Sequence, residues 1–464
     1  MHMRSSLHFS IAAVIAFFTW VPAVGQEFHP YPEWGLEVWA GPDMVFNKRT
    51  RHENGKMMEE YRSIDGRTGE LRGFREEGPF SPTGPQGPRY RQVVNWNGKT
   101  YRLGHITRKE GKARFIDILL TGMSGSDLSY VTPEQPIASI EGEWPYEGHT
   151  VVDHRISPDG SKLLVYVYGI IVVKKRSWVC VVLDSDERTW SMVQPHFEDI
   201  KPAKDYFIDN QGVVHVLMAS ELFRVEENMI EQFKIEVPTE GGLWAGSLQS
   251  SGSRFQIFGF IGEKYFKEPK LVFMEFDLAA RSLTAPKFSD FPYLHKFVPK
   301  EVIVKKADDV YWLSVNDRRW NPSFMPPYSA TKNMFICRIH LDGSLEWAMH
   351  MPKMMTSYSI DMPDVILHPK DDQLIVLFQD HPDALEARQK GEEPKYGINP
   401  LRYLDTEYEI IQMTVSPDQK TEYKWFEVDG ARSRWGYVQQ IDEDTYFSGN
   451  AHKDEKNGFF YWTF

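Results

Sequence analysis

The chain has 464 residues, of which 14% are aromatic and 25% charged, and its formal net charge is −12. This composition is typical of a globular protein with a large core, and the acidic balance argues against nucleic acid or an anionic membrane surface as the main partner. The mean hydropathy of −0.45 leaves only the extreme N-terminus apolar enough to enter a membrane.

The N-terminus has the pattern of a secretory signal. Arg4 precedes an apolar run, Ile11 to Val21, and the small residues Ala23-Val24-Gly25 follow it, which predicts cleavage after Gly25. The run is shorter than the ~20 residues that a membrane span needs, and this disfavours an uncleaved anchor. We therefore expect residues 1–25 to be a signal peptide and the mature chain to be periplasmic or secreted, without a membrane span.

Residues 26–90 are less regular than the rest of the chain. A short strand is predicted at Leu36–Trp39, and two polar strand-like segments, 56–62 and 69–75, flank a turn. A Pro/Gly-rich stretch at 78–88 then leaves little capacity for ladder hydrogen bonds. The sequence therefore predicts an N-terminal extension over 26–90, with a disordered tail as the alternative.

The clearest repeating unit runs from Asp153 to Trp190. The pair Asp159-Gly160 predicts a tight turn, because glycine tolerates the positive φ that a two-residue hairpin requires. Apolar, β-branched and aromatic residues then predict successive strands at Leu163–Tyr168, Ile170–Val173, Trp178–Leu183 and Thr189–Val193. Four antiparallel strands in about 40 residues is the size of one propeller blade.

Similar units, spaced by roughly 40–65 residues, are predicted from Arg91 to the end of the chain. We therefore predict an all-β fold, a β-propeller of six or seven four-stranded blades over 91–464. The chain ends on the predicted strand Phe459–Phe464 with no further strand to pair with it. An N-terminal strand, either Glu37–Trp39 or one near Arg91, is expected to complete that blade and close the ring.

One motif carries a resemblance to a known family. The segment Ile156-Ser-Pro-Asp-Gly-Ser-Lys-Leu-Leu-Val-Tyr166 resembles the Ser-Pro-Asp-Gly strand motif of TolB-type β-propeller repeats. Weaker echoes occur at His368–Asp372 and at Val415-Ser-Pro-Asp418, where glycine does not follow the aspartate. The overall plan is similar to that of the exported six-bladed propellers of Bacteroidetes, many of which have no assigned activity. The resemblance implies a propeller and does not imply a function.

No catalytic, cofactor or metal motif is present. The chain lacks HExxH, P-loop and dinucleotide signatures, and Gly122–Gly125 lacks the spacing of a nucleophile elbow. Cys180 and Cys337 lie in separate apolar strands and are predicted to be buried free thiols. His149 and His154 are interpreted as ordinary polar residues. We therefore expect no cofactor and no metal.

The first candidate ligand site is an insertion, residues 316–330. Its arginines offer forked donors and its aromatic residues offer flat apolar faces, a mixture that suits sugars, peptides or carboxylated ligands. The residues concerned are Arg318, Arg319, Trp320, Phe324 and Tyr328. The alternative is a long loop whose aromatic side chains cover the propeller edge.

The second candidate lies in an interruption between Gln379 and Tyr408. Asp380, His381 and Asp383 have the side chains needed for cation binding or acid–base chemistry. The alternative is a solvated turn that caps a short helix over Pro382–Lys390.

These observations favour an exported, non-catalytic β-propeller that binds a glycan, a peptide or a protein partner. One alternative is a carbohydrate-active enzyme, a glycosidase or lyase, with carboxylates in the central funnel. Another is a structural interaction module of the cell envelope. A centre lined by carboxylates and aromatic side chains favours the enzyme, and an exposed patch on the loops favours a binding protein.

Overall fold

The computed structural model of the chain is almost entirely β-structure. It describes residues 25–30, 37–40, 44–54, 56–65, 68, 70–80, 89–124, 128, 136–143, 151–172, 175–184, 189–194, 203–227, 229–238, 242–263, 267–291, 299–321, 328–357, 365–390, 392, 394, 409–425, 431–441, 444–453 and 456–464. Within this part of the chain no helix is long and apolar enough to span a membrane.

The described strands form eight antiparallel sheets, and nearly every sheet uses strands that are consecutive in the chain. The first four sheets are β2 (Glu37–Ala40), β3 (Met44–Glu53), β4 (Lys56–Asp65) and β5 (Leu71–Phe80); β6 (Arg89–Trp96), β7 (Lys99–Glu110), β8 (Ala113–Met123) and β9 (Pro136–Glu141); β10 (Val151–Ile156), β11 (Leu163–Val172), β12 (Lys175–Leu183) and β13 (Thr189–Gln194); and β14 (Asp205–Ile208), β15 (Val214–Leu217), β16 (Glu221–Glu226) and β17 (Met229–Lys234).

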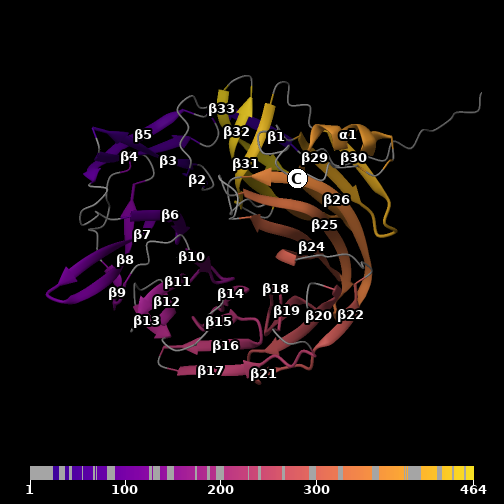
Figure 1. Ribbon diagram of the computed structural model, residues 1–464, viewed down its shortest axis with the longest axis horizontal. Helices are drawn as coiled ribbons and strands as arrows, with labels where there is room; N and C mark the ends of the chain where they lie inside the picture. The colour runs from indigo at the N-terminus through magenta and orange to yellow at the C-terminus, as the bar shows by residue number, and fades with distance from the viewer. Residues whose placement is uncertain are drawn as a thin grey trace, which may run out of the picture.

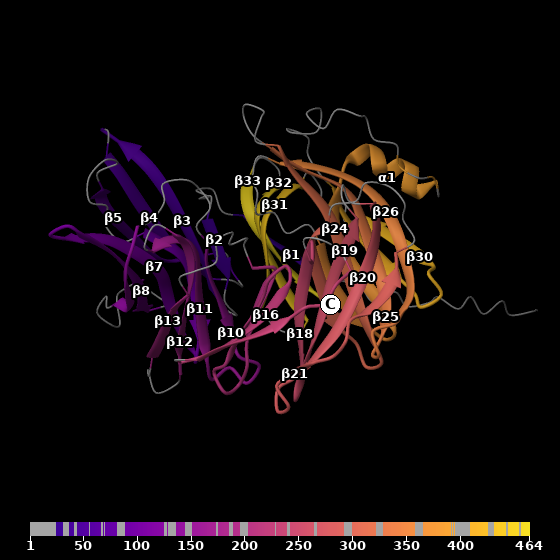
Figure 2. The ribbon, with the colours of Figure 1, turned by 60° about the horizontal axis from the view of Figure 1, so that its bottom comes forward.

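The next three sheets continue the same plan. They are β18 (Ala245–Ser251), β19 (Arg254–Glu263), β20 (Lys267–Asp277), β21 (Ser282–Leu283) and β22 (Lys287–Asp290); β23 (Pro299–Lys306), β24 (Val310–Asn321), β25 (Tyr328–His340) and β26 (Leu345–Ser357); and β27 (Val365–Lys370), β28 (Gln373–Asp380), β29 (Glu409–Val415) and β30 (Thr421–Trp425). The helix α1 (Pro382–Gln389) follows β28, close to the predicted 382–390, and Figure 2 shows it on the outside of the sheets beside β26 and β30.

The remaining sheet joins the two ends of the chain. It contains β31 (Ala431–Gln440), β32 (Thr445–Lys453), β33 (Lys456–Thr463) and β1 (Gly25–Pro30). Strand β1 pairs antiparallel with β33, from Gly25 opposite Thr463 to Pro30 opposite Gly458. The expected partners, Glu37–Trp39 or a strand near Arg91, instead lie in β2 and β6 of other sheets. These segments do not pair with β33 because each forms a hairpin with the strand that follows it, β2 with β3 and β6 with β7.

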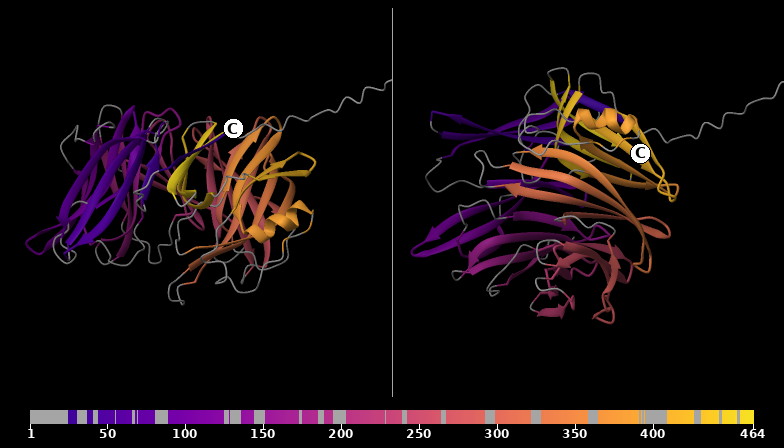
Figure 3. Two further views of the ribbon diagram at one scale, coloured as in Figure 1. Left: turned by 90° about the horizontal axis from the view of Figure 1, so that it is seen from above. Right: turned by 45° about the vertical axis from the view of Figure 1, so that its right-hand side comes forward.

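The sheets follow one another around a common centre in chain order (Figure 1). The first strands of neighbouring sheets lie side by side along the series β2, β6, β10, β14, β18, β23 and β27, and β2 also lies next to β31. The first strand of each sheet therefore lies nearest the centre, and later strands such as β13 and β17 lie at the periphery. Two further views are given in Figure 3, where the colours again follow the sheets in chain order. Radially arranged four-stranded antiparallel sheets are the architecture of a β-propeller.

The stretch 26–90, set apart in the sequence as an N-terminal extension, contains the complete sheet β2–β5. The described residues thus form eight sheets, where the sequence predicts six or seven units. Apolar patterning does not reveal this sheet because several of its buried positions are charged. Glu59, Glu60 and Arg62 on β4 are all less than 7% exposed, and Arg62 pairs with Glu60 at 3.0 Å. The predicted signal peptide lies outside the described residues except for Gly25.

The core consists of layers between neighbouring sheets, and β11 shows why its sequence is a continuous apolar run. Side chains of a strand alternate between its two faces. Leu163, Val165 and Val167 pack toward the β6–β9 sheet, whereas Leu164 and Tyr166 pack toward the β14–β17 sheet. Both faces of the blade are therefore buried. The two cysteines are buried free thiols in different sheets, as predicted.

The Ser-Pro-Asp-Gly motif forms the turn between β10 and β11. Ser157 N donates to Lys162 O at 2.9 Å, Gly160 has φ +77°, and Asp159 Oδ1 accepts from Ser161 N at 3.0 Å. The echo after β29 forms a similar turn, in which Gln419 takes the positive φ of the missing glycine, at +64°. The motif is therefore a hairpin signal that does not depend strictly on glycine.

One buried histidine makes stability depend on pH. His215 on β15 is 0% exposed, its ring centroid lies 4.8 Å from that of Phe255, and its Nε2 is 3.4 Å from Asp209 Oδ2. Burial lowers the pKa of His215 below its ordinary 6.5, by more than Asp209 raises it. His215 therefore binds a proton more readily in the unfolded chain than in the folded protein. The contribution of neutral His215 to the free energy of unfolding is complete above pH ~6.5 and is lost as pH falls through the folded-state pKa.

We expect the urea midpoint of the wild-type protein to fall between pH 7 and pH 5, and to fall less in His215→Gln, which keeps a donor for Asp209 but does not titrate. His154 and His368 also have lowered pKa values, for which burial is the main cause, so part of the slope should remain in the variant. Identical slopes for the two proteins would show that His215 does not carry this linkage.

Candidate functional site

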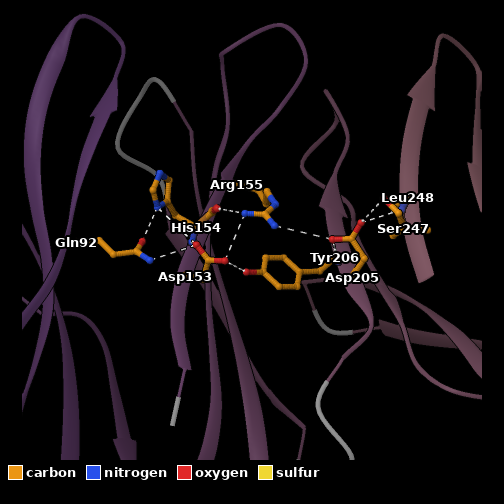
Figure 4. Close-up of polar contacts among 8 residues, drawn as sticks. All are labelled: Gln92, Asp153, His154, Arg155, Asp205, Tyr206, Ser247 and Leu248. Carbon is orange, nitrogen blue, oxygen red and sulfur yellow. Dashed lines mark hydrogen bonds and ion pairs between the residues drawn. The ribbon is translucent and has the colours of Figure 1, made fainter. Parts of the chain in front are cut away.

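Polar side chains gather on the first strands of four successive sheets, nearest the common centre (Figure 4). They come from β6, β10, β14 and β18, which lie next to one another. We call this set the central polar network, and it consists of Gln92, Asp153, His154, Arg155, Asp205, Tyr206 and Ser247. Because its hydrogen bonds and ion pairs connect four sheets, the network is the candidate site.

Strand β10 contributes three consecutive polar residues. Its pairing with β11 places Asp153 opposite Tyr166, His154 opposite Val165 and Arg155 opposite Leu164. Because neighbouring residues of a strand point to opposite faces, Arg155 faces β14 and His154 faces β6. The contacts agree with this, and the carboxylate of Asp153 reaches both sides.

Asp153 is bonded from four directions. Its Oδ1 accepts from Gln92 Nε2 at 3.3 Å and from His154 N at 2.7 Å. Its Oδ2 accepts from Tyr206 Oη and lies 3.3 Å from Arg155 Nη1. Burial alone would raise the pKa of Asp153, but Arg155 and the Tyr206 hydrogen bond outweigh it, so the pKa lies below its ordinary value. Asp153 is therefore an ionised, acceptor-only carboxylate at neutral pH.

Asp205 is held by the neighbouring sheet. Its Oδ2 accepts from Leu248 N at 2.8 Å and from Ser247 Oγ at 3.3 Å, while its Oδ1 accepts from Tyr206 N at 2.9 Å. Arg155 Nη2 is 3.9 Å from Oδ1. Here burial is the largest influence and raises the pKa of Asp205 above its ordinary value. The two carboxylates therefore have pKa values shifted in opposite directions.

Arg155 lies between the two carboxylates and remains 45% exposed at its side chain. Its guanidinium carbon lies 4.7 Å from the centroid of the Tyr206 ring. Tyr206 in turn stacks on Tyr166 at 4.4 Å, and Tyr166 stacks on the fully buried Trp178 at 6.3 Å. A partly exposed cation is thus fixed on an aromatic stack that continues into the core.

The network offers hydrogen-bond donors and acceptors without an excess of positive charge. One guanidinium faces two carboxylates, and burial lowers the pKa of His154 below its ordinary value, with Arg155 lowering it further and Asp153 opposing. An anion would therefore find no net positive field here, whereas a neutral polyhydroxyl ligand would find both donors and acceptors. In the described part of the chain, no group of three or more His, Cys, Asp or Glu side chains is placed to hold a metal ion.

The first sequence-predicted site lies elsewhere. The segment expected to be an insertion loop is mostly a hairpin, because β24 continues to Asn321 and β25 begins at Tyr328, with Arg318 opposite Thr331. The backbones of Arg319 and Trp320 also belong to β24. The side chains of these residues, and all of Phe324, lie outside the described part, so their role as ligand contacts stays a prediction.

Asp380 of the second predicted site has a structural role. It is 0% exposed and pairs with Arg388 of α1, Nη2 to Oδ2, at 2.6 Å. Its Oδ1 also accepts from His381 N at 2.9 Å, at the start of the helix. The carboxylate of Asp380 is therefore buried and anchors α1, and the alternative of a solvated turn concerned Asp383 and stays a prediction. The side chain of Asp383 lies outside the described part.

The central polar network was missed in the sequence although its main strand opens the clearest repeating unit. The available signal was Asp-His-Arg, three polar residues in a row after Val151-Val152 and directly before the Ser-Pro-Asp-Gly turn. The prediction that His154 is an ordinary polar residue does not capture its hydrogen bond to Gln92. Gln92, Asp205, Tyr206 and Ser247 carry no comparable local signal.

Comparisons with known proteins find only distant similarity to solved structures. No protein-family model matches the chain, and no curated protein matches it. Similar solved structures include Sqt1 from Chaetomium thermophilum bound to the N-terminus of the ribosomal protein L10, with 10% identity, TM-score 0.45, and 94% of this chain and 99% of that chain covered. The β-propeller domain of the Trilobed protease from Pyrococcus furiosus has 12% identity, TM-score 0.35, and coverage of 85% and 95%.

TolB from Acinetobacter baumannii, whose type of repeat the Ser-Pro-Asp-Gly segment resembles, is also among the similar structures, with 12% identity, TM-score 0.23, and coverage of 66% and 79%. The chain spans only 56% of the tricorn protease, which aligns at 8% identity and TM-score 0.30. At such identities and TM-scores, the partner or activity of these proteins says nothing about this chain.

Proposed function

We propose that the protein is an exported, non-catalytic β-propeller of eight blades that binds a glycan through the central polar network. Eight described sheets support the blade number, and the pairing of β1 with β33 supports closure of the ring by the two chain ends. The N-terminal pattern of residues 1–25 supports export. The predicted mature N-terminus, Gln26, is checked by the mass of the protein recovered from a periplasmic or culture fraction.

The observation that carries the binding proposal is the exposed guanidinium of Arg155 within a network that four blades hold in place. Sites built on rigid strands and supported by further hydrogen bonds are typical of ligand recognition. The charge balance of the network favours a neutral ligand. Hydroxyl groups both donate and accept hydrogen bonds, so they match the donors and acceptors that the network contains. Binding of a peptide or an envelope protein is a competing outcome.

A second function, a carbohydrate-active enzyme, is favoured by two observations. Two carboxylates and an aromatic ring, those of Asp153, Asp205 and Tyr206, lie on inner strands, the arrangement expected above for an enzyme. The pKa of Asp153 lies below its ordinary value and the pKa of Asp205 lies above it. In enzymes that use two carboxylates, such opposite shifts allow one group to act as the base and the other as the acid. The bonding of both groups favours the non-catalytic proposal, since each carboxylate oxygen already accepts from a protein donor. A carboxylate so engaged is poorly available to a substrate.

The test uses arrays of neutral oligosaccharides, uronic-acid oligosaccharides and peptides, with binding and turnover both recorded. We expect binding to neutral oligosaccharides without cleavage. Arg155→Met should weaken it about 10–100-fold, the effect of losing a charged hydrogen bond. Arg254→Met is the matched control, because Arg254 on β19 is 52% exposed and outside the network; it should bind like wild type. Cleavage of any glycan, or equal effects of the two variants, would overturn the proposal.

A further inference from the structure

The hydrogen bonds around His154 determine which ring nitrogen carries its proton. Asp153 is an ionised carboxylate and only accepts, so the amide group of Gln92 must turn its nitrogen toward Asp153, at 3.3 Å. The amide oxygen of Gln92 then faces His154 Nδ1, at 2.6 Å. An oxygen acceptor at that distance requires a proton on Nδ1, which leaves Nε2 of the neutral ring as a lone pair.

Within the described part of the chain, no group donates a hydrogen bond to the Nε2 lone pair. None of the hydrogen bonds of His154 to the described part of the chain involves Nε2, and the side chain is 25% exposed. The charged groups acting on the ring are Asp153, 4.0 Å from Nδ1, and Arg155 on the same strand, while β6 contributes the neutral Gln92. Burial and Arg155 together keep the ring neutral near pH 7.

We propose that His154 Nε2 is the hydrogen-bond acceptor of the central site, which receives an O–H or N–H of a neutral ligand, and that Gln92 and Asp153 are positioning residues that hold its tautomer. This inference rests on the proposed function and adds the group that the ligand must present. It also makes binding depend on pH, because protonation converts Nε2 from an acceptor into a donor.

The tautomer is tested without a ligand, by ¹H–¹⁵N correlation of the histidine-labelled protein. The His154 signal is identified by its absence in His154→Gln. We expect a protonated Nδ1 and an unprotonated Nε2 at pH 7.5, and a mixture of tautomers in Gln92→Leu, which cannot accept from Nδ1. A protonated Nε2 in the wild-type protein would overturn the inference.

The acceptor role is tested on the same array of neutral oligosaccharides between pH 8 and pH 5. Wild-type binding should be constant at pH 6.5 and above and should weaken about tenfold as pH falls through the His154 pKa, which lies below its ordinary 6.5. Binding by His154→Gln, which offers an amide oxygen that does not titrate, should be flat over this range, and binding by His154→Phe should be weak throughout. Binding that is present but independent of pH in the wild type overturns this inference alone, whereas absence of binding to every glycan overturns the proposed function.

Discussion

Replacement of Arg388 by methionine is expected to lower the free energy of unfolding by about 3–5 kcal/mol, because it leaves a buried carboxylate without its cation. The side chains of Arg388 and Asp380 are 4% and 0% exposed. Arg388 also donates to Pro352 O on β26 at 2.6 Å, and its guanidinium carbon lies 5.6 Å from the centroid of the Phe378 ring. The pair therefore fastens α1 to the β27–β30 sheet and to its neighbour.

The measurement is urea unfolding at pH 7, with Lys390→Met as the control. Lys390 pairs with Glu386 close to the same helix end, but these side chains are 58% and 73% exposed, so its loss should change stability by less than about 0.5 kcal/mol. The double variant Asp380→Leu/Arg388→Met should be less damaging than the sum of its single changes, since no unpaired charge remains. Additive effects would contradict this account of the pair.

Replacement of Trp178 by alanine is expected to cost about 3–5 kcal/mol, the range for removal of a fully buried large aromatic side chain. Trp178 on β12 is 0% exposed, and its ring centroid lies 6.3 Å from that of Tyr166 and 6.4 Å from that of Phe223. A cavity at this position would remove support from Tyr166 and, through it, from Tyr206 of the central polar network.

The loss is measured by urea unfolding, together with oligosaccharide binding by the fraction that stays folded. Met229→Ala on β17 is the control, because its side chain is among the exposed large apolar ones, at 39%, and it should change stability by less than about 0.5 kcal/mol. Equal destabilisation by the two variants would show that burial of Trp178 is not what matters. Trp178→Phe should fall between them.

Much of the fold was predictable because its signals are local. The apolar run of β11 and the turn at Asp159-Gly160 identify one four-stranded unit, and β12 and β13 follow as expected. Leu163–Tyr168 and Ile170–Val173, predicted as two strands, form the single strand β11 with a register shift between Tyr168 and Ile170, and β10 supplies the fourth strand. The β2–β5 sheet was not identified because Glu59, Glu60 and Arg62 occupy buried positions, where a pattern search expects apolar residues. Arg62 pairs with Glu60 two residues earlier on the same strand, so both charges can be buried where a pattern search expects apolar side chains.

The central polar network was harder to predict than the fold, because its residues are far apart in the sequence. Asp153 meets Gln92 and Tyr206, which are 61 and 53 residues away. Neither partner belongs to a motif, and only the fold brings their strands together. Prediction instead favoured segments with dense local chemistry, such as 379–390, where Asp380 proved to be a buried anchor for a helix.

The pairing of Gly25–Pro30 with Lys456–Thr463 also affects how the molecule is made. The first of these segments leaves the ribosome long before the second is made, and such distant pairing is slow to form. Any product that stops before residue 456 lacks β33 and leaves strand edges bare, which invites aggregation or proteolysis. The pairing of β1 with β33 therefore makes this sheet depend on synthesis through residue 463.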